Sequence, residues 1–310
     1  MGAWGVGLYS GDFAQDLKST ISAVCRLPLP EERLVDAICD TESSAAADPA
    51  NEDHTIFWLV LADQFEKRRI FCERVRRTAL SIINGGKDAA TMQALGMTPA
   101  DTRKRAAKLV ELRARLLAQP EASPERKTIK SPEPYVFDLY GVYAYPICGG
   151  EPINPYMTAK HFDRAAWHPD GIGLMMVVSR GRAFGYLAWY VAVKATESMP
   201  AVLDRAVVAA TVRWAAPFYG TCNPMHFRKL ELSEVGVFNL DPARVDHFFP
   251  HLAAGNVYAV KDISIANRMK IGRIEPRHWW RRPDGKTEPI VYPPAPTLTE
   301  LALAKPGIQD

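Results

Sequence analysis

The residue pattern changes abruptly across residues 119–134, and this change constrains the fold more than any other feature of the sequence. The segment reads QPEASPERKTIKSPEP, with prolines and no periodic apolar residues, which is typical of a linker between domains. Apolar residues recur at helical spacing before it, whereas aromatic and β-branched residues dominate after it. We therefore expect an α+β protein with a helical domain at residues 1–118 and a β-rich domain at residues 135–310.

Helical spacing also predicts individual elements of the first domain. Asp12 is the expected N-cap of the first helix, with Phe13, Leu17 and Ile21 on one face. The last helix is expected to start at Thr98 or Asp101 and to bury a stripe that consists of Leu109, Leu112 and Leu116. Other helices are expected over residues 31–39, 54–69 and 72–84, the last of these closed by Gly85 and Gly86, and residues 41–53 are expected to form a loop.

The second domain is expected to form a barrel-like or bent sheet. The segment 135–147 is rich in aromatic residues, and residues 173–195 suggest two strands joined by a tight turn at Ser179–Gly181. Further extended segments are expected near residues 207–214, 235–240 and 257–260. Asp241 and Pro242 favour the start of a short helix, and the tail at residues 292–307 is rich in proline before a brief helix.

The glycine-rich opening, MGAWGVGLYSGDFAQDL, raises the question of a phosphate-binding loop. Too few residues precede the glycines for a buried first strand, and no G-K-[ST] motif follows. Asp12 stands where the phosphate would bind and carries the wrong charge for it. We therefore expect a bent lead-in whose Trp4, Leu8 and Tyr9 pack against the helical domain.

The same opening resembles the start of a bacterial family, the domain of unknown function 4259 group. The matching residues are Gly2, Trp4, Gly5, Gly7, Asp12, Ala14 and Asp16, while Tyr9 replaces the usual Phe. The resemblance continues through FWLVLADQFEKRRIFCERVRRTALSIINGG and RKRAAKLVELRARLL, over roughly the first 117 residues. The segment DLYGVYAYPICGGEP is similar to the start of the small barrel of immunity 26-type proteins, which protect bacteria from toxins. These resemblances imply a bacterial cytosolic protein and supply no catalytic residues.

Composition excludes several protein classes. The formal net charge is only +3, which alone does not indicate a nucleic-acid partner. No apolar stretch approaches the ~20 residues of a membrane helix, and the N-terminus lacks the features of a secretory signal. The five cysteines include no C-x-x-C pair, so we expect reduced thiols, a cytoplasmic location, no metal and no cofactor.

Three groups of residues carry types that could support chemistry. His247 and His251 have the i,i+4 spacing of a metal pair, although Pro250 lies between them. Cys222 and His226 have the types of a nucleophile and its base, although their sequence suggests a turn or helix start. A polar loop is the third group, and it is where a small-molecule or hydrolytic site would be sought: Asn154, His161, Asp163, His168 and Asp170.

Basic and aromatic segments indicate binding instead. Residues 66–77 carry six Lys or Arg against two Glu, and residues 103–115 carry six against one. Such runs usually form solvated helix faces, but they could also contact nucleic-acid phosphates or an acidic partner. The segment 277–282 combines basic residues with adjacent tryptophans, which is typical of a protein-binding hot spot or of stacking on single-stranded nucleic acid. The residues concerned are Arg277, Trp279, Trp280, Arg281 and Arg282.

No motif reaches the specificity of a catalytic constellation. The sequence therefore favours a non-catalytic bacterial interaction protein with a protein partner, such as an immunity protein, an inhibitor or an adaptor in toxin or phage conflict. Two alternatives stay open. One is nucleic-acid binding through the basic segments 66–77 and 103–115, and the other is a hydrolase or nuclease that uses the loop 154–170.

Overall fold

The chain divides into two compact units, Met1–Ser131 and Pro132–Asp310. The structure, a computed structural model, describes residues 5–118, 124–154, 167–200, 204–252, 264–270, 279–281 and 287–303. The boundary lies inside the proline-rich segment expected to be a linker. The described part of that segment bonds to both units. In the first unit, the Arg126 guanidinium donates to the carbonyl oxygens of Cys25 and Leu29, and in the second, the Glu133 amide donates to the Tyr186 carbonyl.

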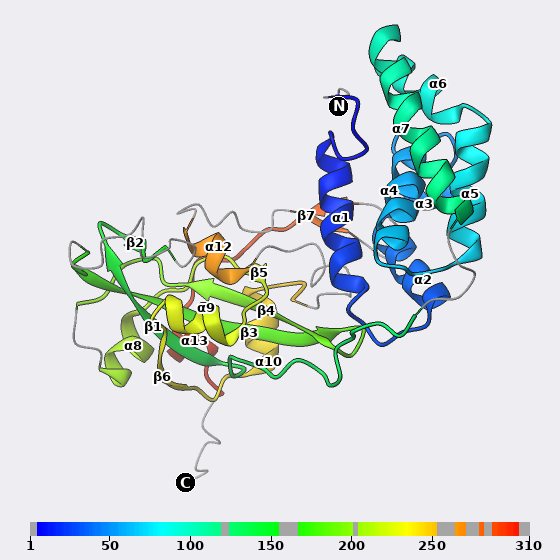
Figure 1. The fold of residues 1–310 in the computed structure, drawn as a ribbon. Coiled ribbons are helices and arrows are strands. Elements are labelled where there is room, and N and C mark those ends of the chain that lie inside the picture. Colours follow the sequence, from blue (N-terminus) through cyan, green and yellow to red (C-terminus); the bar gives the residue numbers. More distant parts are fainter. Residues whose placement is uncertain are drawn as a thin grey trace. The chain divides into compact units, whose positions relative to one another are not determined.

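The first unit is helical, as expected (Figure 1). Its centre is α4 (His54–Lys67), which is buried almost all round from Thr55 to Phe65 and packs against α1, α3, α5, α6 and α7. The apolar run in the sequence accounts for this position, because a helix without a polar face needs cover on most sides. The surrounding helices are α1 (Asp12–Val24), α2 (Glu31–Thr41), α3 (Ser43–Ala47), α5 (Glu73–Asn84), α6 (Lys87–Ala94) and α7 (Pro99–Ala118).

Helix ends show where local rules hold. The Thr98 hydroxyl accepts the Asp101 amide at 3.2 Å and so starts α7 as predicted. The expected N-cap role of Asp12 is wrong, because Gly11 is the N-cap and Asp12 is the first helical residue, where its charge still favours the helix dipole. Residues 41–53 are not all loop, since three alanines extend the short helix α3.

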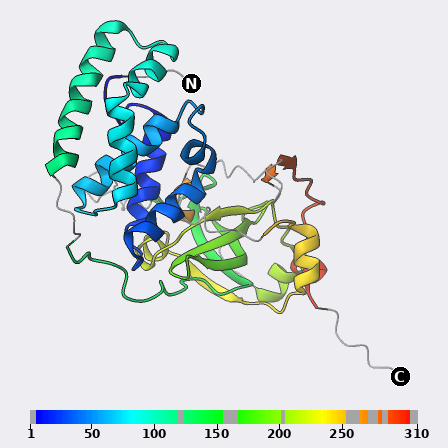
Figure 2. The ribbon, with the colours of Figure 1, turned by 90° about the vertical axis from the view of Figure 1, so that its right-hand side faces the viewer.

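The second unit contains a strongly curled antiparallel half-barrel, which confirms the expected β-rich architecture (Figures 1 and 2). The strand order is β2-β1-β3-β4-β5. The strand β6 pairs with the same edge of β1 as β2 does, but β6 pairs with the first residues of β1 and β2 with the last. Aromatic rings fill the core, where Phe137 packs edge-on against Tyr143 and Tyr190. The strands are β1 (Gly141–Cys148), β2 (Glu151–Pro152), β3 (Gly171–Ala183), β4 (Leu187–Lys194), β5 (Phe218–Gly220) and β6 (Ser233–Val237).

The β3–β4 hairpin turns later than the sequence suggested. β3 continues through Ser179–Gly181, and the chain reverses at Phe184 and Gly185, whose φ angles are 51° and 74°. Gly181 serves a close approach rather than a turn, because a Cβ there would lie 2.4 Å from the Trp189 ring. The predicted turn at 179–181 is therefore wrong.

Short elements complete the second unit. Residues 205–211 form α8 (Arg205–Thr211) instead of the expected strand, because Asp204 accepts two amides of its first turn and the alanine-rich segment favours a helix. The helix after Asp241 is confirmed as α10 (Pro242–Phe248). The extended segment 235–240 is confirmed only in β6, and residues 257–260 lie outside the described residues. The others are α9 (Pro224–Lys229), α12 (Ile265–Lys270), α13 (Leu298–Leu301), and the paired β7 (Trp279–Arg281) and β8 (Thr287–Pro289).

No helix in the described ranges combines the length and the apolar character needed to cross a membrane.

Candidate functional site

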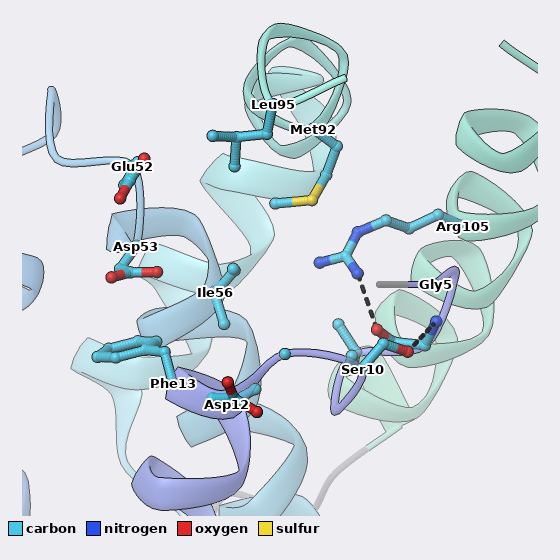
Figure 3. Close-up of a pocket in the computed structure, with 14 residues that line it drawn as sticks. Gly5, Ser10, Asp12, Phe13, Glu52, Asp53, Ile56, Met92, Leu95 and Arg105 are labelled. Atoms are coloured by element: carbon cyan, nitrogen blue, oxygen red, sulfur yellow. Dashed lines mark hydrogen bonds between the residues drawn. The ribbon is translucent and has the colours of Figure 1, made fainter. Parts of the chain in front are cut away.

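The glycine-rich opening borders a cavity of about 60 Å³ in the helical unit (Figure 3). Gly7 and Ser10 close a tight loop, in which the Gly7 amide donates to the Ser10 hydroxyl at 3.0 Å. Burial raises the pKa of the Asp53 carboxyl, and the nearby Glu52 and Glu42 raise it further. The cavity lining includes the carboxylates of Asp12, Glu52 and Asp53, so it disfavours an anion such as phosphate.

A buried ion pair fastens this opening to α7. Arg105 donates to both carboxylate oxygens of Asp88, at 2.6 and 2.8 Å, and to the Gly7 carbonyl at 3.0 Å. Arg105 is 3% exposed and Asp88 is 1% exposed. Figure 3 shows the Arg105 guanidinium pointing from α7 toward the opening loop. This arginine therefore has a structural partner for its charge and holds Gly7 of the opening against α7, while Trp4 of the expected lead-in lies outside the described residues.

A second network holds Tyr9. The Tyr9 hydroxyl donates to Asp63, and the same carboxylate is paired with Lys67 at 2.6 Å and with Arg115 at 2.6 Å. Arg115 also pairs with Glu66. Burial by itself would raise the pKa of Asp63, but the hydrogen bonds from Lys67, Tyr9 and Arg115 outweigh it and hold that pKa below its ordinary value. Burial and the bond to Asp63 raise the pKa of Tyr9.

Ion pairs within the helical unit neutralise several of the cations in the two basic segments. The range 66–77 is not one helix, because it covers the end of α4, a turn and the start of α5. Within it, Lys67 pairs with Asp63, and Arg74 pairs with Asp36 at 3.0 Å. Within 103–115, the cations of Arg105 and Arg115 are paired internally, as described above. A shared phosphate-binding face made of all these cations is therefore not formed.

The most unusual surface is the outer face of α7, which is apolar. Val110 is 64% exposed and Leu117 is 49% exposed, on the side opposite the buried Leu109, Leu112 and Leu116. The residues between and beside them on this face are alanines and are also exposed. Figure 2 shows α7 as the blue-green helix at the left margin of the view. We call this set of exposed side chains the outer stripe: Ala107, Val110, Ala114 and Leu117.

Charged side chains border the outer stripe. Arg103 continues its line toward the start of the helix, and Arg113 is exposed beside Val110 and Leu117. Arg103 forms no ion pair within the part of the chain that the structure describes, and Arg113 donates to the neutral amide oxygen of Asn84. Glu111 is the acid nearest the middle of the stripe. The surface is therefore apolar with a positive border.

The predicted aromatic and basic surface falls partly outside the described residues, which exclude Arg277 and Arg282. Trp279, Trp280 and Arg281 form β7, which pairs with β8 in the register Trp279–Pro289, Trp280–Glu288 and Arg281–Thr287. The two strands form a small sheet separate from the half-barrel sheet.

The polar loop is described only at its ends, since His161 and Asp163 lie outside the described residues. Asp170 accepts the Gly149 amide at 2.8 Å, and its own amide donates to Ile147, so it supports the β1–β2 turn. His168 is exposed, and Asn154 lies two residues after the end of β2. The structure thus shows a local turn role for Asp170, within the part of the predicted site that it describes.

The two predicted pairs do not form their sites. α10 ends at Phe248, so His251 is outside the helix and the i,i+4 arrangement with His247 is absent. Burial raises the pKa of the Cys222 thiol to about 12 and lowers that of His226, so the thiol stays protonated at neutral pH. The backbone amide of His226, not its ring, bonds to Asn223, in the N-cap of α9.

Three of the other thiols follow the same rule. Burial raises the pKa values of Cys25, Cys39 and Cys72 to about 11. Each of the five cysteines is unbridged. Within the described ranges, no three His, Cys, Asp or Glu side chains lie close enough to hold a metal ion.

Comparison of the chain with protein-family models, curated proteins and solved structures finds no match.

Sequence reasoning overlooked two features that the spacing could have indicated. Arg105 stands at the same helical phase as Leu109, Leu112 and Leu116, which marks a buried charge that needs a partner. The outer stripe also has a regular spacing of three and four residues, but it was obscured because alanine is compatible with both exposed and buried positions.

Proposed function

We propose that this protein acts by binding another protein, and that the outer stripe of α7 is the contact surface. The single observation behind this proposal is the exposed apolar face opposite the buried face of the same helix. A surface helix normally presents polar residues to water, so an apolar outer face that is free of cover favours a partner.

The spacing indicates what kind of partner fits. Ala107, Val110, Ala114 and Leu117 are separated by three, four and three residues, which is the spacing of a seam between two packed helices. Small alanines allow a close approach of the second helix. The partner is therefore proposed to present a helix with its own apolar seam.

Charge selects among such helices. Arg103 and Arg113 border the outer stripe, and Glu111 is the opposing charge. A second copy of this chain would bring the same positive border, which disfavours self-pairing. The proposed partner is a protein whose helix carries Asp or Glu beside its apolar seam. Toxin neutralisation, which the resemblance of the second unit implies, is one specific form of this proposal, and the segment 277–282 is a proposed additional contact.

The test uses the full chain, tagged and purified gently from its native cells. A protein that co-purifies in stoichiometric amount is identified by mass spectrometry and then purified for titration. Val110→Glu with Leu117→Glu is expected to weaken its binding at least a hundredfold, since two buried apolar contacts become charges. Val291→Glu is the matched control, because Val291 is 82% exposed but lies in the second unit.

Further measurements separate the occupants. Arg103→Glu with Arg113→Glu is expected to slow association with the acidic partner and to reduce its salt dependence. Equal binding by wild type and by the Val110→Glu, Leu117→Glu variant would refute the proposed surface. A homodimer in light scattering that this variant abolishes would instead identify a second copy as the occupant and refute the acidic partner.

A further inference from the structure

A second region of the helical unit has the features of an anion-binding groove. The groove has a volume of about 480 Å³ and lies where the last turns of α1 and α4 approach residues 124–127. Its lining contains five cations and one acid: Arg26, Arg68, Arg69, Arg126, Lys127 and Glu125. All of these residues belong to the first unit, so the groove does not depend on the second.

Two of the guanidinium groups are held in place by neutral acceptors. Arg126 donates to the Cys25 carbonyl at 2.8 Å and to the Leu29 carbonyl at 2.5 Å. Arg68 donates to the backbone carbonyl of Gln64 at 3.3 Å and to its side-chain oxygen. These bonds fix the two groups, and carbonyl dipoles at helix ends offset only part of their charge. Each arginine therefore keeps most of its positive charge in a fixed position.

Two further cations, Arg69 and Lys127, add charge at the groove. Arg69 and Lys127 are exposed and have no ion-pair partner among the residues that the structure describes. Arg26 is exposed as well. Like charges gathered around one groove repel each other, so an anion placed between them is attracted by all of them.

Arg69 supplies an independent observation. It follows α4 with a φ of 56°, in the left-handed region that favours glycine. The Arg69 amide donates to the backbone carbonyl of Glu66, and the Ile70 amide donates to the backbone carbonyl of Phe65. These two bonds form a Schellman motif. Phe65 and Ile70 are buried and supply the apolar contact of that motif. Glycine would fit this position without strain, so the fold does not account for the arginine, whereas an anion site does.

The balance of charge and the lining define the ligand. With Arg26 left out of the count, four cations against one acid leave an excess of about three positive charges, and one phosphate monoester carries about −1.5 to −2 at neutral pH. None of the described residues that line the groove is aromatic, so no ring is present on which a base could stack. We propose that this groove binds a small ligand through two adjacent phosphate groups.

The experiment is calorimetric titration of the full chain with inorganic pyrophosphate at low and at physiological salt. We expect saturable binding with one site, which weakens as salt rises. Arg69→Gly should weaken pyrophosphate binding at least tenfold and at the same time raise the melting temperature, because it removes a contact and relieves the backbone. Lys127→Ala should weaken binding without a change in melting temperature. Arg77→Ala is the matched control, since Arg77 is exposed, carries the same charge and does not line the groove.

The outcomes separate clearly. A nucleoside diphosphate that binds as tightly as pyrophosphate supports recognition of the two phosphates alone, and tighter binding of the nucleoside diphosphate supports a nucleotide as their source. The proposal is overturned by no binding at millimolar pyrophosphate, by unchanged affinity in Arg69→Gly, or by an equal loss in Arg77→Ala. It is also overturned if a single-stranded oligonucleotide binds at Arg69 and pyrophosphate does not compete with it.

Discussion

Replacing Arg105 by methionine removes the positive partner of a buried carboxylate. Asp88 is 1% exposed and would lose hydrogen bonds of 2.6 and 2.8 Å, while the Gly7 carbonyl would lose its donor at 3.0 Å. Breaking one half of a buried ion pair costs about 3–5 kcal/mol of folding free energy. Lys104→Met is the matched control one residue away, because its pair with Asp101 is exposed to solvent and should contribute little to stability.

The assay is urea denaturation followed by the far-ultraviolet helical signal, which reports mainly on the first unit. Arg105→Met should lower the urea midpoint several times more than Lys104→Met does. Adding Asp88→Leu to Arg105→Met removes the unpaired charge and should restore part of the loss. If Arg105→Met is no more destabilising than Lys104→Met, or if the added Asp88→Leu is further destabilising by a similar amount, the reasoning from the buried charge is wrong.

Three further predictions follow from other sites. The pKa of Asp63 is lower in the folded state than in the unfolded state, so the charge of Asp63 stabilises the fold fully above the unfolded pKa of about 4. The difference in stability between wild type and Asp63→Asn should therefore disappear as the pH falls through the folded pKa. Urea midpoints measured between pH 2 and pH 7 test this. Gly181→Ala should be destabilising by about 1–3 kcal/mol because its Cβ would lie 2.4 Å from the Trp189 ring, whereas Gly11→Ala, with no atom within 4 Å, should lose only the smaller preference of an N-cap for glycine over alanine, as thermal melts can show. Four thiols should react slowly with a disulfide reagent at pH 8 until urea is added, since burial raises their pKa values to about 11 or 12: Cys25, Cys39, Cys72 and Cys222.

The sequence was most informative where burial has a simple period. Leu109, Leu112 and Leu116 predicted the buried face of α7, and the apolar run from Ile56 to Ala62 predicted the central helix. Capping residues with a short polar side chain also predicted where helices start, as Thr98 and Asp241 show. In these cases, the cause of the structure lies within one or two turns of the chain.

Prediction failed where the cause lies in a distant residue. The glycine at position 181 suggested a turn, but glycine is required there because the ring of Trp189 on the neighbouring strand leaves no room for a Cβ. Val207 and Val208 favour a strand by propensity, but the cap at Asp204 starts a helix. The anion groove brings Arg68 and Arg126 together from segments far apart in the sequence, and no local pattern connects them.

The bonds that hold the opening segment can form only late in the synthesis of the helical unit. The Gly7 carbonyl bonds to Arg105, 98 residues later, and Asp63 pairs with Arg115, 52 residues later. Neither bond can form until α7 has been made and has left the ribosome. Gly7 and the residues beside it are thus fixed only after α7 has emerged, and until then the nascent chain exposes apolar surface of α1 and α4 that the complete helical unit buries.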